Sequence, residues 1–184
     1  MKFIKTCSAL SQDGDRATAL LDGLHPISFE AISEGIIRVS VKKQDNFRLS
    51  RTWSIAQGGA TVPLKGHSRE HLPGKRLSFG HDSQEFFTKD ISVKIHSEPY
   101  YLEWSYRGEV VLSERTTGAL AFGRQDHRLW HFHQLREDSR FYGLGERSGE
   151  LDRRGRSFEL RNVDPMGYDA KSSDPLYKLS LIHI

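Results

Sequence analysis

The chain has 184 residues, 36% of them hydrophobic and 28% charged, which suffices for one domain of ordinary size with a buried core. Its 27 Lys and Arg outnumber its 24 Asp and Glu by only three, too small an excess to predict a nucleic-acid or anionic-membrane partner. The single cysteine, Cys7, excludes an internal disulfide.

The N-terminal residues MKFIKTCSAL contain two lysines but no apolar run of the length that a secretory signal needs. No other window approaches the length of a membrane span. We therefore expect a cytoplasmic protein without a membrane partner. The sequence does not determine its oligomeric state.

Apolar residues at every second position predict β-strands in the first two thirds of the chain. The segments 25–33 and 35–43 alternate in this way, with one face apolar and the other polar. The apolar residues of these two segments are Ile27, Phe29, Ala31, Ile37, Val39 and Val41.

Seven more segments have strand-like composition, and turn-forming residues separate most of them. The Arg107-Gly108 pair predicts a hairpin between 100–107 and 109–114. No stretch keeps a helical period, so the pattern predicts an all-β, antiparallel β-sandwich. The seven segments are 83–88, 91–97, 100–107, 109–114, 128–135, 140–145 and 157–162.

The chain changes character after 157–162, where it reads VDPMGYDAKSSDPLYK with two Asp-Pro pairs and one glycine. This composition predicts a long ordered loop. Long loops in compact domains are usually functional.

Histidines near position 130 raise the question of a metal site. His131 and His133 would share one face of a strand, and His127 and Asp126 lie close by in sequence. No cysteine accompanies them, and Trp130 and Phe132 alternate with the two histidines. We expect an ordinary strand with an imidazole-bearing outer face, and no metal or other cofactor.

Four arginines are clustered at Arg153, Arg154, Arg156 and Arg161. A nucleic-acid surface would be broader and accompanied by a larger charge excess. We expect these arginines to hold a loop through bonds to nearby carboxylates. The candidate carboxylates are Glu146, Glu150 and Asp152.

The stretch GLGERSG has closely spaced glycines but lacks the lysine and hydroxyl residue that end a phosphate-binding loop. It predicts a tight turn with glycines at positive φ. Carboxylates for acid–base chemistry are also present, but their spacing does not select a pair. They are Glu146, Asp152, Asp164, Asp169 and Asp174.

Residues 141–178, FYGLGERSGELDRRGRSFELRNVDPMGYDAKSSDPLYK, contain several spaced motifs in one order. They are YGLGE, LDRRG, the pair Asn162 and Asp164, and DPLYK. This succession resembles glycoside hydrolase family 31, the α-glucosidase and α-xylosidase group, at the junction between its N-terminal β-sandwich and its catalytic barrel. The resemblance is dense over about 40 residues and diffuse over the rest.

The resemblance implies a galactose-mutarotase-like β-sandwich over residues 1–161 and a junction loop over 162–178. Family members cleave α-glycosidic bonds with retention, using two carboxyl groups of the barrel. The chain is then expected to carry no catalytic residue and to be inactive by itself. Its partner in the full-length enzyme would be an oligosaccharide or α-glycoside.

In the family, a loop of the sandwich reaches the mouth of the barrel and shapes the substrate pocket. By position, Asp164 would accept hydrogen bonds from sugar hydroxyls and Tyr168 would offer a ring face. Asp169 is a weaker candidate. For Asp164, the alternative role is to cap a turn before Pro165.

The last six residues, LSLIHI at 179–184, stand where the family has an apolar, proline-containing stretch. They resemble the translation of an adaptor used in sequencing libraries, so we expect a scar rather than a strand. Two rival functions stay open: a free-standing carbohydrate-binding sandwich, and a basic β domain that binds nucleic acid.

Overall fold

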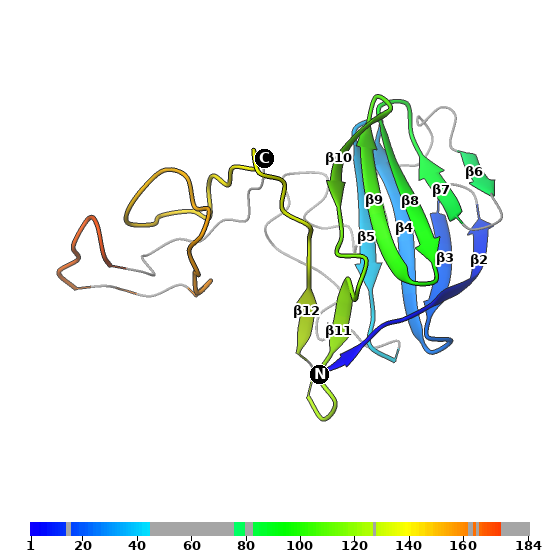
Figure 1. Cartoon of the computed structure of the whole chain (residues 1–184), viewed down its shortest axis with the longest axis horizontal. Coiled ribbons are helices and arrows are strands. Elements are labelled where there is room, and N and C mark those ends of the chain that lie inside the picture. The colour runs from blue at the N-terminus through cyan, green and yellow to red at the C-terminus, as the bar shows by residue number, and fades with distance from the viewer. Residues whose placement is uncertain are drawn as a thin grey trace. The chain divides into compact units, whose positions relative to one another are not determined.

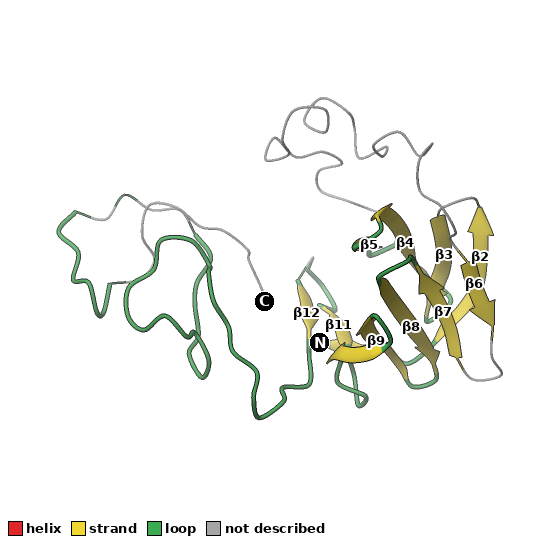
Figure 2. Cartoon of the chain, turned by 90° about the horizontal axis from the view of Figure 1, so that it is seen from above, coloured by secondary structure: helices red, strands yellow, loops and turns green. Residues whose placement is uncertain are grey.

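The computed structural model describes residues 1–13, 16–44, 76–79, 83–126, 128–161, 164 and 166–173 (Figure 1). The chain divides into two compact units, Met1–Gln134 and Leu135–Ile184. All strands of the described residues lie in the first unit, and the described part of the second consists of turns and loops (Figure 2). Within these ranges there is no helix long and apolar enough to cross a membrane.

The first unit contains a four-stranded antiparallel sheet in the order β2-β3-β4-β5. Neighbouring strands of this sheet are consecutive in sequence, which is the simplest way to join antiparallel strands. Its strands are β2 (Cys7–Asp13), β3 (Arg16–Leu21), β4 (His25–Ser33) and β5 (Ile36–Val41).

A five-stranded antiparallel sheet, in the order β10-β9-β8-β7-β6, forms the second layer (Figure 1). In the turn between β9 and β10, Arg107 has φ 49° and Gly108 has φ 85°, as a tight two-residue hairpin requires. The strands are β6 (Arg76–Phe79), β7 (Ser83–Phe87), β8 (Ile91–Ser97), β9 (Tyr100–Tyr106) and β10 (Glu109–Ser113).

A small third sheet joins the N-terminus to the end of the first unit. Its order is β1-β11-β12, with β1 (Lys2–Phe3) and β12 (Leu129–His131) on either side of β11 (Leu120–Phe122). All three residues of β11 are buried. The N-terminal residues are therefore an integral part of the fold.

The core lies between the two larger sheets. Phe29 of β4 contacts Phe86 of β7, with their ring centroids 6.4 Å apart. Burying such side chains supplies most of the free energy of folding, about 1.5–3 kcal/mol for each large apolar residue. The largest fully buried side chains are Leu21, Ile27, Phe29, Phe86, Val93, Ile95 and Tyr100.

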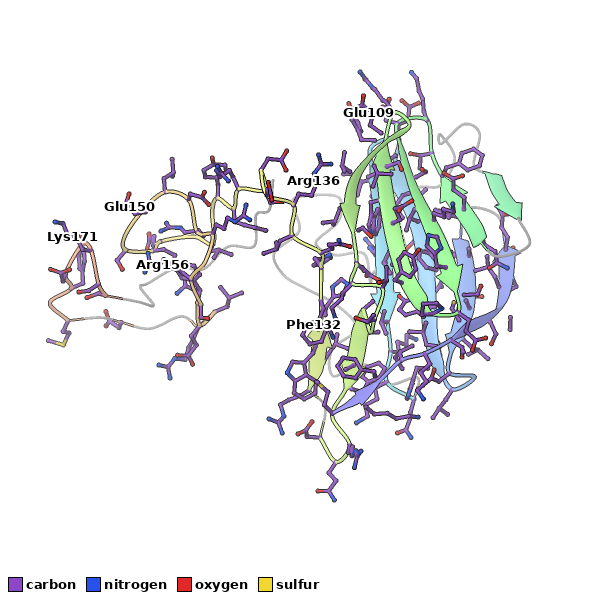
Figure 3. The ribbon with its side chains drawn as sticks, in the orientation of Figure 1. Glu109, Phe132, Arg136, Glu150, Arg156 and Lys171 are labelled. Carbon is purple, nitrogen blue, oxygen red and sulfur yellow. The ribbon has the colours of Figure 1, made fainter. Side chains whose placement is uncertain are left out.

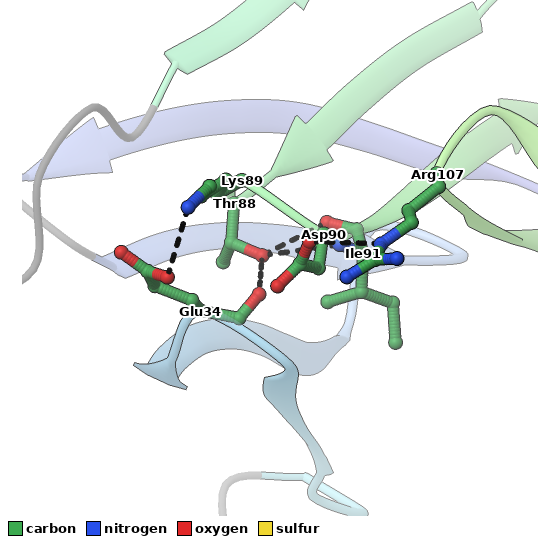
Figure 4. A network of polar contacts seen from close by, with 6 residues as sticks. All are labelled: Glu34, Thr88, Lys89, Asp90, Ile91 and Arg107. Carbon is green, nitrogen blue, oxygen red and sulfur yellow. Dashed lines mark hydrogen bonds and ion pairs between the residues drawn. The ribbon is translucent and has the colours of Figure 1, made fainter.

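Three turns are fastened together at one end of the sandwich (Figure 4). The Thr88 hydroxyl donates to the carbonyl oxygen of Glu34, and Asp90 N–H donates to the same oxygen at 3.3 Å. Arg107, in the β9–β10 turn, pairs with Asp90 at 3.3 Å. These contacts join the β4–β5 turn of one sheet to the β7–β8 and β9–β10 turns of the other.

The structure confirms the predicted all-β, antiparallel fold and six of the predicted strand segments, from β4 and β5 to β7–β10. The predicted apolar face of β4 is buried: Ile27, Phe29 and Ala31 are at most 3% exposed. The segment 128–135 is a strand only at Leu129–His131, followed by an isolated bridge between His133 and Glu114.

Two predicted strands are wrong. Residues 140–145 do not form a strand because Gly143, Leu144 and Gly145 all have positive φ, between 69° and 92°. The same values confirm the predicted turn of the GLGERSG stretch. Residues 157–161 are also irregular. There, Glu159 O accepts a hydrogen bond from Arg147 Nη2 at 2.6 Å rather than from a neighbouring strand.

Candidate functional site

The three residues predicted to meet substrate lie in the second unit, and all are exposed. Asp164 and Asp169 are exposed carboxylates, and the Tyr168 side chain is 58% exposed. Tyr168 and Asp169 are neighbours in one loop. Among the described residues, no hydrogen bond or ion pair joins either of them to Asp164.

The Asp169 carboxylate stabilises its own turn. It accepts hydrogen bonds from the hydroxyl of Ser172 at 2.8 Å and from the N–H groups of Lys171 and Ser172 at 2.9 Å. The Ser172 hydroxyl and these two N–H groups lower the pKa of Asp169. Asp169 therefore has a structural role in this loop.

The loop of residues 166–173 is tied to the preceding segment. Gly149 N–H donates to Ala170 O at 3.0 Å. Gly149 has φ 86°, and a Cβ built at this position would lie 2.2 Å from Arg156 Nη1. A side chain here would be strained because the backbone is left-handed, and it would also have to displace the end of the Arg156 side chain.

Arginines hold this segment mainly through main-chain carbonyl oxygens. Arg153 Nη1 donates to Ser148 O at 3.0 Å and to Glu150 O at 2.6 Å. Arg154 Nη1 donates to Glu137 O and Ser139 O. The predicted loop-holding role is confirmed, but the guanidinium groups of these two arginines bond to carbonyl oxygens and not to the predicted carboxylates.

Asp152 is a predicted carboxylate that does pair with an arginine guanidinium. The guanidinium belongs to Arg140, which lies outside the predicted arginine cluster. It accepts hydrogen bonds from the N–H groups of Arg154 at 3.0 Å and Phe141 at 3.1 Å, and pairs with Arg140 at 3.3 Å. The two N–H groups, followed by Arg140 and Arg154, lower its pKa. Asp152 thus closes the loop that begins at Phe141.

A cavity of about 290 Å³ lies among these arginines. The guanidinium carbon of Arg156 is 4.9 Å from the centroid of the Phe158 ring, and those of Arg147 and Arg153 are each 5.8 Å from it. The cavity is lined by Leu135, Phe141, Tyr142, Leu144, Arg153, Arg154, Gly155, Arg156 and Phe158.

Sequence reasoning did not find this cavity. It assigned Phe141, Tyr142 and Leu144 to one strand and Phe158 to another. The available signal was the presence of apolar residues on both sides of the arginine cluster in RFYGLG and SFEL. Irregular loops bring these residues around the arginines. The alternation of apolar and polar residues predicts strands and gives no information about such loops.

The histidine candidates for a metal site are engaged within the first unit. His131 Nε2 bonds the Oε1 atom of the buried Glu114. The ring of His131 lies against that of His133, with centroids 4.2 Å apart, and Asp126 pairs with Arg128 at 2.6 Å. The described residues contain no group of three or more His, Cys, Asp or Glu that could hold a metal; His127 lies outside them.

Comparison with solved structures shows how widely the fold occurs. A glycoside hydrolase 31 dextranase of Flavobacterium johnsoniae, complexed with glucose, aligns over 97% of the chain with a TM-score of 0.78 and 22% identity. A cycloalternan-forming enzyme of Listeria monocytogenes aligns over 89% with a TM-score of 0.67 and 18% identity. The chain corresponds to 21% and 15% of these two proteins.

Among curated proteins, alpha-glucosidase 2 of Bacillus thermoamyloliquefaciens is 25% identical over 158 residues. That alignment covers 84% of the chain and 19% of the enzyme, so the chain spans about a fifth of this relative. The family model of the glycosyl hydrolase 31 N-terminal galactose mutarotase-like domain matches residues 26–179. The chain therefore belongs to the glycosyl hydrolase 31 family, as its N-terminal galactose mutarotase-like domain.

Proposed function

We propose that the chain is the non-catalytic N-terminal domain of a retaining α-glycoside hydrolase of the α-glucosidase or α-xylosidase type, and that it shapes the substrate pocket. The match to the family model carries this proposal, since it runs through residue 179 and includes the loop with Asp164 and Tyr168. The substrate would be an oligosaccharide or α-glycoside, and the enzyme cytoplasmic.

The contacts of two carboxylates support a non-catalytic role. A retaining glycosidase needs two carboxyl groups about 5–5.5 Å apart, one as nucleophile and one as acid and base. Asp152 and Asp169, both considered as candidates, bind N–H groups of their own loops. Their pKa values are lowered, whereas a catalytic proton donor needs a raised one, so neither resembles a proton donor.

Asp164 is the strongest candidate for contact with a sugar. Its carboxylate is exposed, and two vicinal hydroxyl groups are suitable donors to it. Tyr168 exposes a ring that can pack against the apolar face of a pyranose. In this proposal, both side chains reach the substrate from the stretch that leads to Ala170. The carbonyl oxygen of Ala170 accepts a hydrogen bond from Gly149 N–H, which holds this stretch in place.

The substitution Asp164→Ala in the full-length enzyme tests the pocket-shaping role. We expect kcat/KM to fall about 10- to 100-fold, because a hydrogen bond to a charged group contributes about 1.5–3 kcal/mol. The circular dichroism and melting temperature should not change. Asp138→Ala, which removes another exposed carboxylate of the second unit, is the matched control. Wild-type kinetics of Asp164→Ala would exclude the role.

The proposed domain limits are residues 1–161 for the sandwich, 162–178 for the junction loop and 179–184 for an adaptor scar. The scar and Asp174 lie outside the described residues. Sequencing the genomic DNA beyond the codon for Lys178 tests the last limit. If the native gene encodes LSLIHI at this point, the scar is refuted.

A further inference from the structure

The cavity of the second unit is lined by both apolar residues and arginines. Five of its lining residues are apolar or aromatic, three are arginines, and none is acidic. Tyr142 and Leu135 are also exposed to solvent, Leu135 by 56%. An apolar cavity with several positive charges at its wall is suited to an anionic group attached to an apolar one.

No carboxylate among the described residues neutralises the positive charge of two of these arginines. Arg153 and Arg156 bond only to carbonyl oxygens and to the Phe158 ring, and no described carboxylate pairs with either. Arg154 differs because a carboxylate lies near it: the charge of Arg154 lowers the pKa of Asp152. The uncompensated charge is therefore located at Arg153 and Arg156.

Arg153 carries the second indication of a ligand. The residue is only 9% exposed, and its Nε is buried without a hydrogen-bond partner. The same holds for the hydroxyl oxygen of Ser148, whose carbonyl oxygen is bonded by both Arg153 and Arg156. A buried, charged donor without a partner destabilises the fold, and a carboxylate is the acceptor that suits a guanidinium best.

The arginines are held in place before any ligand arrives. Arg153 is held by two carbonyl oxygens, and Arg156 lies in the space left by Gly149 and over the Phe158 ring. Such side chains lose little conformational entropy on binding. Figure 3 shows Arg156 and Glu150 on the loops of this unit.

We propose that the cavity binds a polypeptide segment that presents a carboxylate next to an aromatic or aliphatic side chain. About 290 Å³ is at the lower limit of ligand cavities and accommodates one such side chain. A polypeptide is preferred to a small acid because the same unit also exposes the apolar side chains of Leu151 and Leu160. The inference does not depend on the proposed glycosidase function.

The test uses the full 184-residue chain labelled with ¹⁵N and the peptide acetyl-Gly-Glu-Phe-Gly-amide. We expect saturable shifts of backbone amide signals within residues 141–158, with Kd of about 0.1–1 mM. The peptide with Gln in place of Glu should bind at least about fivefold more weakly, because the charge-assisted bond is lost. This comparison needs no altered protein, so it does not depend on the folding of a variant.

Variants identify the arginines. Arg156→Gln should weaken binding of the Glu peptide about fivefold or more. Arg128→Gln removes an exposed arginine of the first unit and should leave the affinity for the Glu peptide unchanged. Each of three results would refute the site: equal affinity for the Glu and Gln peptides, shifts confined to the first unit, or no saturation at 10 mM, which is about ten times the upper limit of the expected Kd. Equally tight binding of 3-phenylpropionate would refute the polypeptide as its ligand.

Discussion

His25 illustrates how burial determines the chemistry of a single residue. It is 5% exposed, its ring centroid lies 4.6 Å from that of Phe122, and its Nδ1 accepts a hydrogen bond from Gln44 N–H at 3.1 Å. A protonated ring would lose this acceptor. Burial first, and then Lys2 and Lys43, lower the pKa of His25, whereas Asp22 acts in the opposite direction.

We predict that stability falls as the pH is lowered from about 7 to about 5. The unfolded histidine, with a pKa of about 6.5, takes up its proton before the folded one does, so protonation favours the unfolded state in this window. Urea unfolding midpoints measured across the range test this. The fall should be smaller in His25→Gln, which keeps an acceptor for Gln44, than in the wild type. It should not vanish, because the pKa of His96 is lowered too, by burial and by Lys94.

Residue patterns predicted buried positions better than they predicted polar partners. Ile27, Phe29 and Ala31 are buried as expected, since alternation of apolar and polar residues specifies a face directly. The partners of Arg153 and Arg154 are carbonyl oxygens of nearby turns, and no side-chain pattern encodes these. For the same reason, the exposure of Asp164 and the turn made by Asp169 could not be read from spacing.

At the scale of elements, the strands that were predicted carry β-branched or aromatic residues in an apolar pattern, and several strands without that signal were missed. The three residues of β11 are all buried and show no alternation, and β2 is largely exposed along its length. In β3 the buried positions are Ala17, Ala19 and Leu21, where alanine gives a weak strand signal. Residues 140–145 have a strand-like composition, but the positive φ of their glycines excludes a strand.

The turns at one end of the sandwich lead to a prediction about how its two sheets are joined. Thr88→Val removes the hydroxyl that donates to Glu34 O or Ile91 O and accepts from Ile91 N–H. Thr88 is only 9% exposed, so the substitution removes these hydrogen bonds from a largely buried position, although Glu34 O keeps the N–H of Asp90 and Ile91 O keeps that of Thr88. We expect a loss of about 1–3 kcal/mol in the free energy of unfolding.

Urea unfolding of Thr88→Val and of Thr117→Val measures this effect. Thr117 is exposed and should tolerate the same substitution within about 0.5 kcal/mol. If both variants lose equal stability, the valine itself is responsible and the proposed fastening of the two sheets is wrong.

At the scale of the whole molecule, the chain is a β-sandwich followed by a loop-rich unit, and it belongs to a family of glycoside hydrolases. It spans about a fifth of the relatives with which it aligns. The family and the sandwich could be predicted from sequence because the spaced motifs of residues 141–178 and the alternating strands are local features. The cavity could not, since it depends on how irregular loops fold back on one another.

We propose that the chain carries a domain that shapes a substrate pocket and does not itself catalyse hydrolysis. The most direct test is an assay of the purified 184-residue chain with maltose, p-nitrophenyl α-glucoside and p-nitrophenyl α-xyloside. We predict no release of sugar or p-nitrophenol above the uncatalysed rate, because in the proposed function the chain contributes neither of the two catalytic carboxyl groups. Turnover that co-purifies with the chain and survives removal of contaminating glycosidases would contradict the account.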